Sequence, residues 1–157
     1  TMVTTTPEPT TIAPAAAAQA HQLVRIYVGL GGAVHALVFE FEDGTLTGSL
    51  LDAAGGPLPL TTVSGRLSES MIVEPGEVMV KVSGHGTRVH QYLCNDIKFH
   101  FQSGREITFH FQNWPGWQGE PFDVSVESGF SFRDLEFAGG TVVGINGTRQ
   151  VTTTPEP

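Results

Sequence analysis

The chain has 157 residues, of which 39% are hydrophobic and 15% charged, and its formal net charge is −8. This length and composition predict one globular domain with its own core. The negative charge argues against a nucleic-acid partner, whose phosphates require a basic surface. No apolar run approaches the roughly 20 residues needed to cross a bilayer, so membrane insertion is not expected.

The same seven residues, VTTTPEP, occur at 3–9 and again at 151–157. Thr, Pro and Glu offer nothing to bury, and Thr-rich stretches with Pro are typical of extended, extracellular stalks. We therefore predict linkers at residues 1–20 and 150–157 around one domain at residues 21–149, cut from a tandem array. The alternative interpretation is an artefact or simple terminal disorder.

Between the linkers, nineteen glycines and ten prolines interrupt short apolar stretches, and several of these alternate with a period of two. This pattern predicts an all-β fold. Alternation places Met79 and Lys81 on the face opposite the neighbouring valines. The residues predicted to share a face are Leu37, Phe39 and Phe41 in one strand, and Val78, Val80 and Val82 in another.

The segment 96–112 predicts a β-hairpin whose register can be derived. A two-residue loop would place apolar residues opposite polar ones along the whole ladder. A three-residue loop at 102–104 instead places apolar residues opposite apolar ones and polar residues opposite polar ones. That loop also puts Gly104 at the left-handed position such loops require. The predicted pairs are Phe99 with Ile107 and Ile97 with Phe109 on one face, and His100 with Glu106 and His110 with Asp96 on the outer face.

The sequence lacks the patterns of common catalytic and metal sites. It contains no G-x-S-x-G, H-E-x-x-H or P-loop motif, and its six histidines do not have zinc-like spacing. Glu40, Glu42 and Asp43 could hold a hard cation, but a solvated hairpin end is the favoured interpretation. The single cysteine, Cys94, excludes an internal disulfide and is expected to be a buried thiol. We predict no enzyme activity, no metal and no cofactor.

The run 76–111 resembles the central part of a jacalin-related lectin domain. The residues that carry the resemblance are Gly76-Glu77, Val82-Ser83-Gly84, Leu93 and the aromatic hairpin 97–111. Residues 23–44 are similar to the early strands of that family, and residues 119–145 to its closing strands. The resemblance implies a β-prism of three four-stranded Greek-key sheets; from the alternating strands alone, a β-sandwich fits equally well.

The resemblance also implies a sugar site between a glycine-rich turn near the N-terminus and a late G-x-x-x-D loop. Here the late loop corresponds to residues 139–144, and Val143 or Gly144 stands at the aspartate position. Thr11–Gln22 replaces the glycine-rich first strand. The backbone amides at Gly139, Gly140 and Thr141 remain candidates for binding a sugar hydroxyl or an anion.

A second candidate site is the loop 113–119, which holds both tryptophans of the chain. Aromatic faces beside amide side chains suit pyranose rings, and tryptophan is also enriched at protein interfaces. The candidate ligand-binding residues are Asn113, Trp114, Trp117 and Gln118. The alternative is that one or both indole rings fold back and cover the end of the domain.

Together these features predict a non-catalytic carbohydrate-binding and adhesion module of a secreted or cell-surface protein with several repeats. Its expected partners are glycans or polysaccharide surfaces and neighbouring repeats, and stiff spacers would let several weak sites act together. The sequon at Asn146 predicts N-glycosylation, which agrees with secretion. The alternative is a structural or adhesive repeat that has lost sugar binding and acts by protein or surface contacts.

Overall fold

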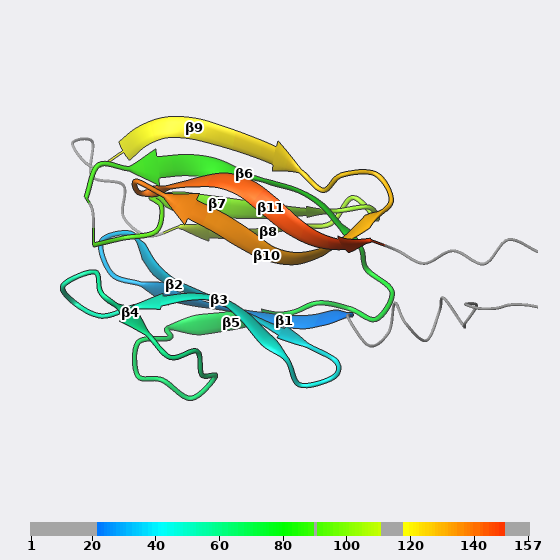
Figure 1. Cartoon of the computed structure of the whole chain (residues 1–157), viewed down its shortest axis with the longest axis horizontal. Helices are drawn as coiled ribbons and strands as arrows, with labels where there is room; N and C mark the ends of the chain where they lie inside the picture. The colour runs from blue at the N-terminus through cyan, green and yellow to red at the C-terminus, as the bar shows by residue number, and fades with distance from the viewer. Residues whose placement is uncertain (1–21, 90, 111–117, 150–157) are drawn as a thin grey trace, which may run out of the picture.

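A computed structural model of the chain describes residues 22–89, 91–110 and 118–149 (Figure 1). Eleven β-strands and no helix occur in these ranges, which confirms the predicted all-β class. None of the described segments forms a helix that could cross a membrane. The predicted linkers, residues 1–20 and 150–157, lie outside the described residues.

The strands form three antiparallel sheets. The first has the order β4-β3-β2-β1-β5 and consists of β1 (Leu23–Leu30), β2 (Val34–Phe41), β3 (Leu46–Leu51), β4 (Pro57–Leu58) and β5 (Glu69–Ile72). The second has the order β8-β7-β6-β9 and consists of β6 (Met79–Thr87), β7 (Asp96–Phe101), β8 (Glu106–His110) and β9 (Gln118–Ser125). The third is the hairpin of β10 (Phe130–Ala138) and β11 (Thr141–Arg149).

The predicted number of sheets is therefore found, but not the predicted four strands in each. The first sheet gains a fifth strand because β5 pairs with the edge of β1 that β2 leaves open. The third sheet contains two strands within the described part of the chain. The strand distribution is accordingly five, four and two.

All three sheets contribute aromatic rings to one core. The ring of Phe39 in β2 lies 5.8 Å from that of Phe99 in β7 and 4.9 Å from that of Phe132 in β10, measured between centroids. Phe109 in β8 packs against Phe99 at 6.2 Å. Because side chains from all three sheets meet in one core, the arrangement is consistent with the predicted β-prism and also with the alternative β-sandwich.

The hairpin of β7 and β8 has the register derived from the sequence. Every predicted pair is present, including Phe99 opposite Ile107 and His100 opposite Glu106. The amide of Phe101 donates to the carbonyl of Arg105 at 3.0 Å, which closes a three-residue loop. Gly104 has a φ of 96°, the left-handed conformation that favours glycine.

The predicted alternation in β6 is wrong at its start. Met79 is buried, with 4% of its surface exposed, whereas Val78 and Val80 are each 37% exposed. The pairing of β6 with β7 shifts between Met79 and Lys81, which is the signature of a β-bulge. The extra residue at Val80 reverses which side chains face the core, so Val82 is buried while Val78 and Val80 are exposed.

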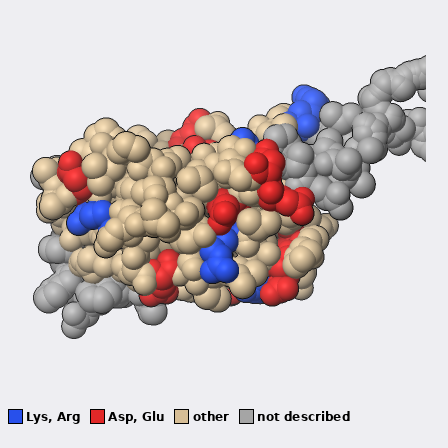
Figure 2. All heavy atoms as spheres, turned by 90° about the horizontal axis from the view of Figure 1, so that it is seen from below, with Lys and Arg blue, Asp and Glu red and all other residues tan. Residues whose placement is uncertain are grey.

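The domain has two distinct ends. β1 begins and β11 ends at the same end of the molecule, which we call the linker end (Figure 1). Thr87 at the end of β6 and the turn between β10 and β11 lie at the opposite end, which we call the loop end (Figure 1). On the face drawn in Figure 2, acidic side chains gather toward the linker end. The domain therefore presents its loop end away from the points where the chain enters and leaves.

His35, near the loop end, is expected to make stability pH-dependent. It is 7% exposed, and its Nδ1 has no hydrogen-bond partner among the described residues. Burial, with a smaller contribution from the positive charge of Arg66, lowers the pKa of His35 below its ordinary 6.5. As the pH falls, His35 therefore becomes protonated in the unfolded chain before it does so in the folded domain. The stability that neutral His35 contributes is present above pH 6.5 and is lost as the pH falls below that value.

The His35→Gln variant, which cannot titrate at this position, tests that expectation. Urea unfolding at about pH 7.5 and about pH 5 should show a smaller acid-induced loss of stability in His35→Gln than in the parent. All other titrating groups are common to both proteins and cancel in the difference. Equal losses in the two proteins would mean that His35 contributes nothing to the pH dependence.

Candidate functional site

The late turn and Gln118, the one described residue of the second predicted site, both lie at the end of β6. Gly139 and Gly140 form the two-residue turn between β10 and β11, with φ angles of 62° and 80°. The carbonyl oxygen of Gly140 accepts a hydrogen bond from the amide of Thr87 at 2.7 Å. On the other side of β6, Thr87 pairs with Gln118 at the start of β9. The late turn and the end of the tryptophan loop thus flank one strand end.

Glycines allow these three backbone segments to approach closely. A Cβ atom added to Gly140 would lie 2.6 Å from the carbonyl oxygen of Thr87, and one added to Gly86 would lie 2.9 Å from the Cβ of Thr141. A Cβ on Gly119 would lie 3.1 Å from the carbonyl carbon of Gly86. The turn can dock on β6 only because no side chain stands between them.

An open hollow of ≈ 260 Å³ lies at this junction. Two of the residues that line it, Arg88 and Glu120, are charged and exposed. Neither forms an ion pair with any residue that the structure describes. The full lining consists of Gly86, Thr87, Arg88, Gly119, Glu120, Gly139 and Thr141. The hollow thus combines glycine backbone, hydroxyls, one guanidinium and one carboxylate.

The residues at the predicted aspartate position lie outside this hollow. β11 already begins at Thr141, so Val143 and Gly144 belong to the strand and not to a loop. Val143 is 54% exposed and offers no acceptor for a sugar hydroxyl. The carboxylate that borders the hollow is that of Glu120, which comes from β9. Sequence reasoning missed Glu120 and Arg88, because only the pairing of β6 with β9 and the docking of the turn bring them together.

Of the predicted tryptophan-loop residues, Asn113, Trp114 and Trp117 lie outside the described residues. Gln118 is described, is partly buried, and makes no side-chain hydrogen bond to another described residue. Its position opposite Thr87 places the end of that loop beside the hollow.

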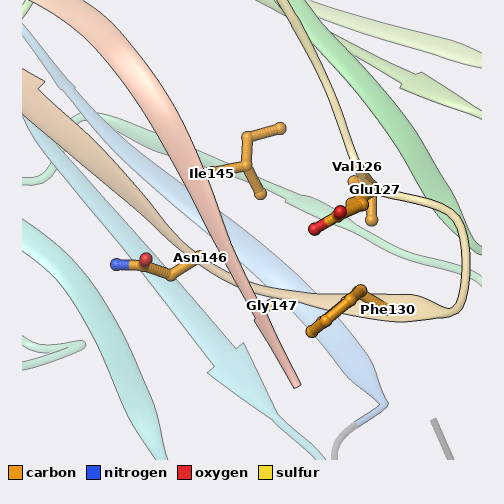
Figure 3. Close-up of a pocket in the computed structure, with 6 residues that line it drawn as sticks. All are labelled: Val126, Glu127, Phe130, Ile145, Asn146 and Gly147. Carbon is orange, nitrogen blue, oxygen red and sulfur yellow. The ribbon is translucent and has the colours of Figure 1, made fainter. Parts of the chain in front are cut away.

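Asn146 lies near the linker end, beside a smaller hollow of ≈ 220 Å³ (Figure 3). This hollow lies between residues 126–130 and β11, and Phe130 pairs with Arg149 at the end of that strand. Figure 3 shows the Asn146 side chain pointing away from Ile145 and Val126. Asn146 is exposed, so its amide is accessible for modification.

The outer face of the second sheet holds paired histidines. His100 contacts Glu106 through Nδ1 at 3.2 Å and Ser83 through Nε2 at 2.7 Å, which confirms the predicted pair. The Nδ1 of His85 lies 3.2 Å from the carboxylate of Asp96. In the described ranges, no group of three or more His, Cys, Asp or Glu side chains could hold a metal ion.

An open hollow of ≈ 480 Å³ lies on this same outer face. Its charged groups already have protein partners. These pairs are His85 with Asp96, Lys98 with Glu106, and Lys81 with Asp123. The loop-end hollow, with its unpaired charges, is therefore the stronger candidate for binding a ligand.

Comparison with known proteins gives a likeness in fold. No family model matches the chain, and no curated protein matches it. The crystal structure of a prostate-specific WGA16 glycoprotein lectin is similar with a TM-score of 0.50 and 14% identity, over 82% of this chain and 81% of that one.

Two further solved structures align over similar lengths. A Malaysian banana lectin has a TM-score of 0.48 and 16% identity, over 83% of this chain and 85% of that one. Calystegia sepium agglutinin has a TM-score of 0.48 and 15% identity, over 82% and 83%. The similarity to the WGA16 glycoprotein lectin shows that the chain has a lectin-like all-β fold.

Proposed function

We propose that this domain is a non-catalytic carbohydrate-binding module and that a sugar binds in the hollow at the loop end. The observation that carries the proposal is the convergence of a carboxylate and a hydroxyl, from Glu120 and Thr141, on a glycine-lined hollow. Neither side chain makes a hydrogen bond to another described residue, so both are available to a ligand.

These groups match the chemistry of a pyranose ring. A carboxylate accepts hydrogen bonds from sugar hydroxyls, and a threonine hydroxyl can donate or accept. Glu120 would supply the acceptor that is missing from the predicted aspartate position at Val143 or Gly144 of β11. Bare glycine backbone at Gly139, where an added Cβ would meet nothing within 4 Å, would let the ring approach closely. A small number of well-placed polar groups in a concave site is typical of ligand recognition.

We also propose that the predicted tryptophan-loop residues complete this site. Gln118 lies beside the hollow, which supports the idea that the same loop adds an aromatic face for the apolar side of a sugar ring. The residues concerned are Asn113, Trp114, Trp117 and Gln118.

The placement of the chain ends supports an adhesive role in a secreted or cell-surface protein with several repeats. Both ends of the described domain emerge at the linker end, so spacers attached there would leave the loop end free (Figure 1). A glycan on Asn146 would also lie away from the hollow. Several weak sites on one chain would together hold a glycan surface far more tightly than one site.

The second candidate function is a structural or adhesive repeat without sugar binding. The absence of a carboxylate at the predicted aspartate position, which Val143 or Gly144 of β11 occupies, favours it. Such a repeat would act through contacts with proteins or surfaces.

A glycan array probed with a protein that carries several copies of the domain tests the proposal. Glu120→Gln and Thr141→Ala should each reduce retention, with a loss of roughly 10–100-fold expected for the charged acceptor. Melting temperatures should be unchanged, because both side chains are partly or fully solvent-accessible. Glu127→Gln, the same charge change at the linker end, is the matched control and should bind like the parent.

Retention of no glycan by the multi-copy protein, together with adhesion to protein-coated surfaces, would favour the structural repeat. Equal retention by Glu120→Gln and Glu127→Gln would remove Glu120 from the site.

A further inference from the structure

We propose that the sugar recognised at the loop end carries a carboxylate group and that Arg88 binds it. This inference rests on the proposed function and adds the chemical class of the ligand. The candidates are hexuronic acids, which carry a single carboxylate at C6.

The first argument is that Arg88 is the free cation of the described domain. The chain has eight Lys and Arg residues, all in the described ranges. Arg88 makes no hydrogen bond, ion pair or ring contact with another described residue. The seven others are engaged: Arg25 with Ser70, Arg66 with the Leu51 carbonyl, Lys81 with Asp123, Lys98 with Glu106, Arg105 with Glu77, Arg133 with the Phe41 ring and Arg149 with the Phe130 ring.

The second argument is the position of Arg88 at the rim of the hollow. Its neighbour Thr87 is held from two sides, because its amide donates to Gly140 at 2.7 Å and its hydroxyl accepts from Val89 at 3.1 Å. The backbone that carries Arg88 is therefore anchored while the guanidinium stays exposed. A guanidinium presents a planar fork of donors that matches a carboxylate in two parallel hydrogen bonds.

The third argument is that Glu120 leaves Arg88 available. Both residues line the hollow, yet no ion pair joins them. The hollow thus offers one acceptor, for sugar hydroxyls, and one separate cationic donor, for an acidic substituent. A neutral sugar would leave the guanidinium without a partner.

The acidic character of the chain does not oppose this assignment, because on the face drawn in Figure 2 the acidic side chains gather toward the other end of the domain. β6 has nine residues at about 3.3 Å each, so roughly 25–30 Å separate the two ends of the domain. Salt screens charges beyond about 8 Å at physiological ionic strength.

The same distribution limits the kind of acidic ligand. A long polyanion is bound by a row of cations, whereas seven of the eight cationic side chains here are engaged within the domain. One free guanidinium on a chain of net charge −8 fits one carboxylate.

Calorimetry with matched sugars tests the proposal. The probes are methyl glucoside against methyl glucuronide and methyl galactoside against methyl galacturonide, which differ only in the carboxylate at C6. The domain should bind the acidic member of at least one pair about tenfold or more tightly. Arg88→Gln should abolish that preference and keep the affinity for the neutral member, whereas Arg88→Lys should keep part of it.

Arg149→Gln makes the same charge change at the linker end and should behave like the parent. An unchanged preference in Arg88→Gln, or tighter binding of the neutral member in both pairs, would overturn the role of Arg88 while sugar binding itself still stands. Binding of no probe by the parent, even with several copies on one chain, would remove the proposed function and this inference with it.

Discussion

Replacing Phe39 with alanine is expected to destabilise the domain by about 3–5 kcal/mol, because removing a buried phenylalanine ring loses the free energy of its transfer out of water and leaves a cavity. Phe39 is fully buried, and its ring touches Phe99 of the second sheet and Phe132 of the third. The cavity would open where all three sheets meet, and none of them could fill it alone. Urea unfolding measures the loss from the shift of the midpoint at constant slope.

Phe130→Ala is the matched control for this experiment. Phe130 is partly exposed at the linker end, so its truncation should cost only about 1 kcal/mol. A cost for Phe39→Ala as small as that of Phe130→Ala would mean that the three sheets do not share one core.

Replacing Gly140 with alanine is expected to detach the late turn from β6 and to abolish most sugar binding. The added Cβ would lie 2.6 Å from the carbonyl oxygen of Thr87, and the φ of 80° is itself unfavourable for alanine. Strain and the loss of the Thr87–Gly140 hydrogen bond together should cost about 2 kcal/mol. Because the turn forms one wall of the hollow, binding should fall by at least about tenfold.

Gly139→Ala separates the clash from the backbone strain. Gly139 also has a positive φ, of 62°, but a Cβ added there meets nothing within 4 Å. Hydrogen exchange should therefore show the Thr87 amide protected in Gly139→Ala and in the parent, but fast-exchanging in Gly140→Ala. A protected Thr87 amide in Gly140→Ala would show that the turn tolerates the methyl group and that its docking does not depend on glycine.

The fold was predicted most accurately from the sequence where side-chain alternation and turn geometry allow only one strand register. In the hairpin 96–110, the period-two pattern and the turn requirement at Gly104 both select one register, and that register is present. The start of β6 was predicted wrongly because a β-bulge leaves no mark in a run of alternating apolar residues such as Val78–Val82. The count of strands in each sheet depended on the pairing of β5 with β1, which no local pattern specifies.

The candidate site was harder to predict than the fold. Gly139, Gly140 and Thr141 could be selected because they match the late loop of the lectin family that the chain resembles, and the structure places all three at the loop end. Arg88 and Glu120 are ordinary charged residues in the sequence. They gain significance only from tertiary pairing, which brings β6, β9 and the late turn to one hollow and leaves these two charges without partners in the described chain.

The most direct test of sugar binding at the loop end is an NMR titration of the amide-labelled domain with methyl glucuronide, methyl galacturonide and their neutral counterparts. The account predicts that shifts concentrate in residues 86–88, 118–120 and 139–141, and that residues 41–45 and 126–129 at the linker end do not move. Shifts confined to the linker end or to the outer face of the second sheet, with none at residues 139–141, would contradict it.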